Sequence, residues 1–303
     1  MEVSTLPTHR HHRARAAIAA SLVVPFIFVG EALPNTGNGE IQPALPPFHL
    51  TSLSEAPSAS AAPAGQEAIS LSARFMQNSL SDAEDVDWTV KTTLGEVLLQ
   101  SKTSTVNLAL KPGTYEISAA YGNVQIDEAF TLQPESRLDV SFVLNAGALR
   151  VLPHLAKLDN LSATPASETR IYAVNGRDNG KLIATSTLPG EILKLAAGTY
   201  RLISRFANGN AQATTDIEVK AGVIRAVDIA LHAGLAHITL NDPMAVVWKI
   251  TPDEGEALTE NATTFEAVLK PGHYTAEAIV AGHSVSSSFT IEDGEDHFVV
   301  LPN

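Results

Sequence analysis

The chain has 303 residues, of which 45% are hydrophobic, 17% are charged and none is cysteine, and its formal net charge is −13. The hydrophobic fraction excludes a wholly disordered protein, and the length favours two or three domains. The lack of cysteine excludes disulfides, thiolate metal sites and cysteine catalysis, while the acidic balance and scattered basic residues argue against nucleic-acid binding.

The first 32 residues have the pattern of a signal peptide. Three arginines precede an uncharged apolar run from Ala16 to Gly30, which suits a signal-peptide core and is short for a membrane span. Small residues favour cleavage after Ala32, so we expect a periplasmic or extracellular protein. The alternatives are an uncleaved inner-membrane anchor with the folded part outside the cytoplasm, and a buried segment of a cytosolic protein. We interpret three leader histidines as solvated, not as metal ligands: His9, His11 and His12.

Residues 33–66 have the composition of a linker. They contain six prolines and a tract of serine, alanine and proline, without helical or strand periodicity. Such a segment is predicted to be disordered and extended, because proline fixes the backbone and removes hydrogen-bond donors. The short apolar stretch 46–50 is an alternative as a partner-docking motif, but a plain spacer is preferred.

From about residue 68 the chain repeats one unit three times. Each copy has a glycine followed two residues later by a tyrosine, directly after an apolar strand, and an aromatic residue 26 to 28 positions before that tyrosine. Two markers in register indicate a true repeat. The glycine and tyrosine markers are Gly113 and Tyr115, Gly198 and Tyr200, and Gly272 and Tyr274, and the upstream aromatic markers are Trp88, Tyr172 and Trp248.

The repeated segments alternate with a period of two. Tyr115, Ile117, Ala119 and Tyr121 share one face of a predicted strand, which is typical of an antiparallel sheet with one buried side. About seven strands per copy predict three tandem Ig-like, prealbumin-like β-sandwiches over residues 67–146, 147–233 and 234–303. The alternation slips at two positions, where a bulge or an edge strand is expected, namely Ile203 and Arg225. The one helical candidate after the leader is the short segment 155–161.

The repeat markers are predicted to be structural. A glycine allows a positive φ at a tight turn, and the tyrosine can close the end of the sandwich with its hydroxyl on the backbone, as in a tyrosine corner. Trp88 and Trp248 lie inside apolar strands and are predicted to fill the core. The alternative is that the three tyrosines and the tryptophans form stacking platforms for sugars.

The Leu-x-Pro-Gly-x-Tyr step before an alternating strand resembles the signature of bacterial envelope β-sandwich modules of the PEGA, carboxypeptidase-regulatory-like and Cna-B-like kind. The resemblance covers roughly residues 68–303. It implies modules that present, space or dock other parts. Cna-B-like domains often carry a Lys to Asn isopeptide bond, but the opening strand of the first copy has no lysine to meet Asn145, so no crosslink is expected.

No catalytic pattern is present in the sequence. The zincin, P-loop and Gly-x-Ser-x-Gly patterns are all missing, so we predict no catalytic residue, no cofactor and no metal site. His273, His283 and His297 could converge on a metal ion, but separate solvated or edge positions are preferred. Three turns rich in aspartate and glycine are weak calcium candidates and are better explained as hairpin turns or solvated charge: residues 82–87, 175–180 and 292–296.

These observations favour a non-enzymatic exported protein of a bacterial envelope, whose sandwiches form a scaffold or spacer for a protein partner docked on edge strands. A carbohydrate- or surface-binding module is the alternative and would need exposed aromatic residues in a row. The candidates for such a ligand or partner surface are Tyr121 and Phe206, together with Tyr172. A hydrolase with an acid pair between copies is the third hypothesis.

Overall fold

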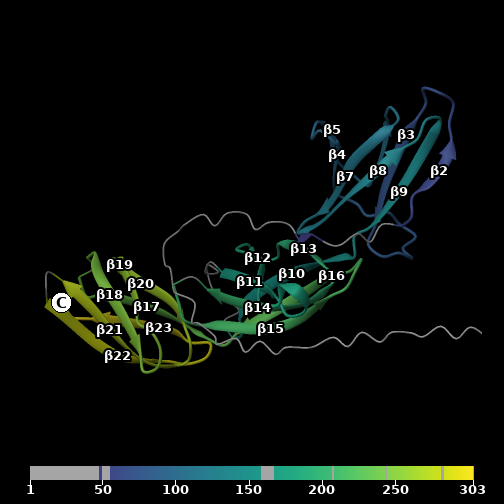
Figure 1. Ribbon diagram of the computed structural model, residues 1–303. Helices are drawn as coiled ribbons and strands as arrows, with labels where there is room; N and C mark the ends of the chain where they lie inside the picture. The colour runs from purple at the N-terminus through teal and green to yellow at the C-terminus, as the bar shows by residue number, and fades with distance from the viewer. Residues whose placement is uncertain are drawn as a thin grey trace, which may run out of the picture. The chain divides into compact units, whose positions relative to one another are not determined.

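The computed structural model describes residues 48–49, 55–157, 167–206, 208–242, 244–280 and 283–302. The predicted signal peptide and its three histidines lie outside these residues, as does most of the predicted linker. The described part of the chain is built almost entirely of β-strands (Figure 1). Within it, no helix has the length and apolar character needed to cross a membrane.

The first module contains nine strands in two sheets. One sheet has the order β1-β8-β7-β4-β5 and the other the order β2-β9-β3-β6. The strands are β1 (Phe48–His49), β2 (Ser58–Ala61), β3 (Ala68–Arg74), β4 (Val86–Thr92), β5 (Val97–Thr103), β6 (Thr105–Ala109), β7 (Gly113–Tyr121), β8 (Val124–Leu132) and β9 (Ser136–Val143).

The second and third modules contain seven strands each. Their sheets have the orders β13-β10-β16 and β12-β11-β14-β15, and β20-β17-β23 and β19-β18-β21-β22. The second module consists of β10 (Ala146–Leu155), β11 (Ser167–Ala173), the 3-10 helix η1 (Gly176–Asp178), β12 (Leu182–Ser186), β13 (Ile192–Ala196), β14 (Gly198–Phe206), β15 (Gln212–Val219) and β16 (Ile224–Leu231). The third consists of β17 (Gly234–Leu240), β18 (Val246–Pro252), β19 (Leu258–Ala262), β20 (Thr264–Leu269), β21 (Gly272–Val280), β22 (His283–Ile291) and β23 (Asp296–Leu301).

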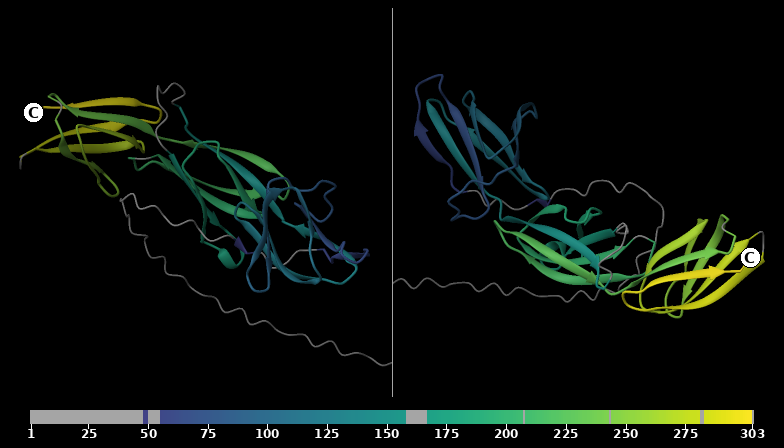
Figure 2. Two further views of the ribbon diagram at one scale, coloured as in Figure 1. Left: turned by 90° about the horizontal axis from the view of Figure 1, so that it is seen from above. Right: turned by 180° about the vertical axis from the view of Figure 1, so that it is seen from behind.

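All three modules share one topology, and Figure 2 shows the same two layers in each. This confirms the predicted all-β sandwich fold. Each copy has seven strands at equivalent positions, to which the first module adds β1 and β2. The sheets are not purely antiparallel, because the first and last strands of each copy pair in parallel: β3 with β9, β10 with β16, and β17 with β23. The long connection through the opposite sheet makes this pairing possible.

Alternation along the strands produces three separate cores. In β7, the side chains of Tyr115, Ile117, Ala119 and Tyr121 point inward and those between them are more exposed. Each module has its own cluster of buried apolar residues, and the clusters contain Trp88, Phe206 and Trp248 respectively. Burial of these inward faces is the main stabilising contribution to each sandwich.

The structure corrects several expectations. Residues 58–61 fall in the predicted disordered linker but form β2. Their local sequence does not favour a strand, but pairing with β9 supplies the backbone hydrogen bonds that hold them in one. No bulge occurs at Ile203, since β14 pairs continuously with both neighbours. Arg225 does lie in an edge strand, β16. The bulges fall instead at Val90/Lys91 and at Ile171/Tyr172. The candidate helix 155–161 begins in the end of β10, and its residues from 158 on lie outside the described part.

Candidate functional site: the repeat markers, a charged face and two module junctions

The three marker tyrosines close their sandwiches in the same way. Each is buried, and each hydroxyl donates to the backbone carbonyl four residues earlier: Tyr115 to Lys111 at 2.6 Å, Tyr200 to Ala196 at 2.8 Å and Tyr274 to Lys270 at 2.8 Å. Burial raises the pKa of Tyr200 to about 12, so this hydroxyl stays protonated and remains a donor. The geometry is that of the predicted tyrosine corner.

We expect Tyr200→Phe to lower the free energy of unfolding by about 1–2 kcal/mol, because the Ala196 carbonyl would lose its partner inside the sandwich. Urea denaturation followed by circular dichroism measures the change. Tyr172→Phe is the matched control, since Tyr172 is only partly buried, and should change stability by about 0.5 kcal/mol or less. Equal effects of the two substitutions would contradict the role assigned to Tyr200.

The marker glycines do not act as predicted. Gly113 and Gly198 do not adopt a positive φ, and only Gly272 does, at 156°. A Cβ at Gly113 or Gly198 would lie 3.8 Å or more from the tyrosine ring two residues later, which is ordinary van der Waals contact. The expected left-handed turn is therefore wrong for two of the three copies.

The aromatic markers upstream are equivalent in two modules only. Trp88 and Trp248 are buried and pair with the residue four positions after the tyrosine, Ala119 and Ala278. The residue in this register in the second module is Thr169, opposite Ser204. Tyr172 lies three positions later, on the outward face, so its assignment as a repeat marker is wrong. The 3-10 insertion between β11 and β12 lengthens this copy and hides the shift in the sequence.

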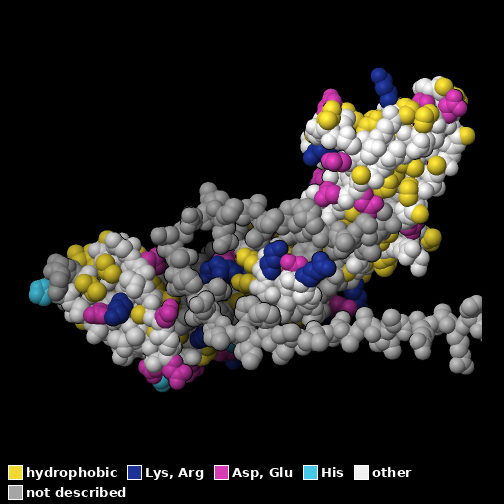
Figure 3. Space-filling view, in the orientation of Figure 1, with side chains coloured by type: hydrophobic (Ala, Val, Ile, Leu, Met, Phe, Trp, Pro, Cys, Tyr) yellow, Lys and Arg dark blue, Asp and Glu magenta, His cyan; other side chains and the backbone are white. Residues whose placement is uncertain are grey.

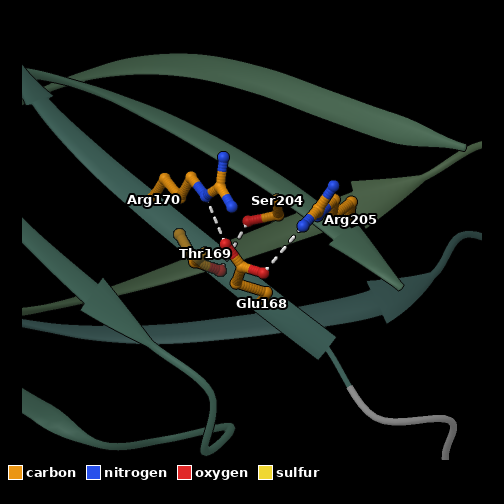
Figure 4. Close-up of polar contacts among 5 residues, drawn as sticks. All are labelled: Glu168, Thr169, Arg170, Ser204 and Arg205. Atoms are coloured by element: carbon orange, nitrogen blue, oxygen red, sulfur yellow. Dashed lines mark hydrogen bonds and ion pairs between the residues drawn. The ribbon is translucent and has the colours of Figure 1, made fainter. Parts of the chain in front are cut away.

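The second module thus has a polar pair where its neighbours have a tryptophan and an alanine. The hydroxyl groups of Thr169 and Ser204 lie 2.7 Å apart and both side chains are buried (Figure 4). One hydroxyl donates to the other, so neither is left without a partner in the core.

An ionic cluster lies on the outward face of the same two strands. In Figure 4, Glu168 of β11 reaches both Arg170 on its own strand and Arg205 on β14. Its carboxylate accepts from Arg170 Nε and, at 2.9 Å, from Arg205 Nη2. Burial raises the pKa of Glu168, but the hydrogen bonds and charges of the two guanidinium groups outweigh burial and lower it. A carboxylate held ionised in this way does not suit general acid catalysis near neutral pH.

The lowered pKa of Glu168 predicts a pH-dependent contribution to stability. The ion pairs stabilise the fold above the ordinary carboxyl pKa of 4.5 and are lost as the pH falls through the lower value of the folded state. We expect Glu168→Gln to cost about 1 kcal/mol or less at pH 7, because the cluster is partly solvated, and progressively less as the pH falls below 4.5. Urea denaturation at pH 7 and at a series of lower pH values measures the difference. Glu218→Gln, in an exposed pair with Lys220, should show no such difference.

The two aromatic residues proposed for a ligand surface are not exposed. Tyr121 is 7% exposed and Phe206 is 1% exposed. Both lie six residues after a marker tyrosine and therefore on the same inward face of the strand. The expectation of a ligand surface at these two residues is corrected, and the strand period alone could have excluded it.

Two of the three predicted surface histidines have partners within the protein. His273 Nδ1 lies 2.7 Å from Thr290 Oγ1, and His297 Nδ1 lies 2.6 Å from Glu295 Oε1. The turn at residues 175–180 connects the antiparallel strands β11 and β12. In the described ranges, no three side chains of the metal-binding types come together in a candidate site.

A turn of the first module contacts the second module directly. Gly122, with a φ of 60°, joins β7 to β8, and a Cβ there would lie 2.4 Å from Cβ of Lys194 on β13. The backbone amide of Asn123 donates to the Lys194 carbonyl at 3.1 Å, and its side-chain amide donates to the Ile183 carbonyl at 2.6 Å. Lys194 Nζ lies 4.3 Å from the centre of the Tyr121 ring and 3.6 Å from Asp85.

The second junction repeats the glycine contact of the first, whereas its asparagine has different partners. A Cβ at Gly209, in the turn between β14 and β15, would lie 2.0 Å from the Val268 carbonyl oxygen on β20. Asn210 accepts from the Lys270 amide at 2.9 Å and donates to the Tyr274 hydroxyl at 3.1 Å. Val268 and Lys194 each lie six residues before a marker tyrosine, so the same turn contacts the same strand position in both junctions.

Sequence reasoning missed these contacts although a signal was present. The Gly-Asn-x-Gln sequence occurs at residues 122–125 and 209–212, in the two copies that another copy follows. The third copy has His283 in place of the asparagine. The signal was the asparagine that recurs in both turns, because a turn of this kind does not itself require an asparagine at that position.

Charge also alternates along the modules. The first module, residues 67–146, contains five basic and eleven acidic residues. The second, residues 147–233, contains ten basic and seven acidic residues, and the third, residues 234–303, contains two basic and eleven acidic residues. On the face seen in Figure 3, Lys and Arg side chains gather over the middle module. The ion pairs between modules follow this pattern, because Lys194 meets Asp85 at 3.6 Å and Lys157 meets Asp293 at 3.2 Å.

The comparisons with known proteins are weak. No family model matches the chain, and no curated protein matches it. Among solved structures it is similar to the TIE protein of Bacillus anthracis, at 16% identity over 78% of this chain and 50% of that one, with a TM-score of 0.26. It is also similar to the minor pilin of Streptococcus agalactiae, at 12% identity over 52% and 95% of the chains and a TM-score of 0.26. It is similar as well to the major pilin subunit of Bacillus cereus, at 9% identity over 78% of this chain and 99% of that one, with a TM-score of 0.20.

The chain thus spans about half the length of the Bacillus anthracis protein. Identities and TM-scores of this size establish neither a common family nor a common activity.

Proposed function

We propose that this protein is a non-enzymatic, exported protein of a bacterial envelope, in which three docked β-sandwiches form a semi-rigid scaffold or spacer for a protein partner. The observation that carries the proposal is the repeated glycine contact, in which the turn after a marker strand meets the same strand position of the next module at both junctions. A flexible string of domains would not need paired asparagine contacts at each connection.

The short connections support stiffness. Only Leu144 and Asn145 separate β9 from β10, and only His232 and Ala233 separate β16 from β17. Connections of two residues leave little freedom once the flanking strands are paired, and the asparagine side chains restrict it further. The module boundaries at residues 67–146, 147–233 and 234–303 belong to this proposal.

Export and partner binding are tested in the native cell. The mature protein should begin near Leu33, and N-terminal sequencing that finds Met1 on a cytosolic pool would contradict export. Crosslinking in intact cells should join the chain to a specific envelope protein. Retention on cell-wall polysaccharide without any crosslinked protein would favour the carbohydrate-binding alternative and contradict the scaffold.

A further inference from the structure

Strand β2 covers one sheet edge of the first module. It pairs antiparallel with β9, and Ser58 lies opposite Asp139. The Ala62 amide donates to the Glu135 carbonyl at 2.8 Å and the Glu55 amide to the Ser141 carbonyl at 3.2 Å. Because backbone groups alternate in direction along a strand, the odd-numbered residues from 135, just before β9, to 141 face β2.

Among the residues that the structure describes, no strand covers the equivalent edge of the third module, which is called the open edge below. The two modules can be aligned because Ala68 and Leu235 both pair with the residue six positions before a marker tyrosine. In this alignment Ser70 corresponds to His237. Their partners on the last strand, Asp139 and Phe298, therefore correspond as well. In the part of the chain that the structure describes, β23 is the last strand of its sheet.

The backbone groups on this edge point outward at known residues. The carbonyls of Glu295 and Leu301 accept from β17 and the residue after it, at 2.8 and 2.9 Å. Residues of odd number in β23 therefore face β17, and Asp296, Phe298 and Val300 direct their amide and carbonyl groups to the open side. These three positions are equivalent to the residues of β9 that face β2.

The open edge also has an apolar surface that β9 lacks. Phe298 is 70% exposed and Val300 is 59% exposed, whereas β9 has Asp139 and Ser141 at these positions. The Phe298 ring stacks on His237 at 4.6 Å between ring centres. His237 in turn lies 2.9 Å from Asp296 and 3.3 Å from Glu266, so carboxylates border the apolar surface.

Charge selects the occupant of this edge. Residues 234–303 contain eleven acidic and two basic residues, so β23 of a second copy would bring like charge against like. We propose that β23 binds an extended segment of a partner protein by antiparallel strand addition, with an apolar side chain opposite Phe298 and a lysine or arginine opposite Asp296. This deepens the scaffold proposal by naming the docking edge, but its test measures binding in solution and depends on neither export nor stiffness.

The probe is a capped synthetic peptide of residues 55–62 with the changes Glu55→Lys, Ser58→Val and Ser60→Lys. In the register of β2 on β9, these changes place valine opposite Phe298 and lysine opposite Asp296. Fluorescence anisotropy with the full chain should show binding about tenfold or more tighter than that of the unchanged peptide, or of a scrambled peptide of the same composition. Equal binding of the scrambled peptide would contradict strand addition.

Two substitutions test the edge itself. Val300→Pro removes an outward amide without touching the ladder to β17, and Val300→Thr keeps that amide as the matched control. Phe298→Ser removes the apolar surface and is informative even if the proline variant does not fold. The proline and serine variants should bind the probe about tenfold or more weakly, and the threonine variant as well as the unchanged protein. Unchanged binding by Phe298→Ser would overturn the proposal, as would sedimentation showing a dimer of the chain that Phe298→Ser abolishes.

Discussion

Gly209→Ala releases the second module from the third while both stay folded. The new Cβ would lie 2.0 Å from the Val268 carbonyl oxygen, and backbone cannot move aside as a flexible side chain can. The hydrogen bonds of Asn210 to the third module would then be lost. Hydrogen exchange measured by mass spectrometry or NMR should show the Lys270 amide exchanging about tenfold or more faster, with core amides of β21 unchanged.

The control for this substitution is Gly198→Ala. A Cβ at Gly198 would lie at ordinary contact distance from the Tyr200 ring, and neither glycine has a positive φ, so the two variants differ mainly in the clash with Val268. The Gly198 variant should leave the Lys270 amide as protected as in the unchanged protein. Full protection of that amide in Gly209→Ala would show that the junction does not hold the modules together.

Trp88→Ala destabilises the first module alone. The tryptophan is 1% exposed, packs edge-to-face on Phe142 at 5.6 Å and donates to the Thr103 carbonyl at 3.0 Å. Removing a buried aromatic side chain of this size costs about 3–5 kcal/mol of unfolding free energy. Urea denaturation followed by circular dichroism should show an early transition.

The second tryptophan reports on the third module in the same experiment. The sequence contains only two tryptophans, so Trp248 fluorescence in the Trp88→Ala variant comes from the third core. Its urea midpoint should stay where it is in the unchanged protein, and Trp248→Ala should give the mirror result with Trp88 fluorescence. A midpoint that moves with the first module would mean that the three sandwiches unfold as one unit.

The fold could be predicted because its determinants are local and repeated. Alternation in β7 and its counterparts gives the buried face, and the tyrosine step recurs because each sandwich needs its end closed in the same way. The parallel pairing of the first and last strands could not be read from the sequence, since pairing partners about 70 residues apart leave no local pattern.

The module junctions and the edge strand β2 were harder to predict, because they too depend on contacts between residues far apart in the sequence. Strand β2 forms in a serine- and alanine-rich stretch because β9 offers it an edge, not because its residues favour a strand. The contacts of Asn123 and Asn210 depend on which module follows, and only their repetition in the sequence pointed to them. Tyr172 was wrongly predicted to be the equivalent of the tryptophans, because it is aromatic and lies at nearly the same spacing from the tyrosine, although its side chain is on the outward face of the strand.

Distances between modules test the account most directly, and a chain without cysteine allows spin labels at chosen positions. Pulsed electron paramagnetic resonance would measure distances between labels at exposed sites, introduced two at a time. Gln100→Cys with Thr185→Cys reports on the first junction, and Thr185→Cys with Thr259→Cys reports on the second. Each pair should give one narrow distance distribution, which Gly122→Ala broadens for the first junction and Gly209→Ala for the second. Broad distributions in the unchanged protein, insensitive to both glycine substitutions, would contradict a docked scaffold.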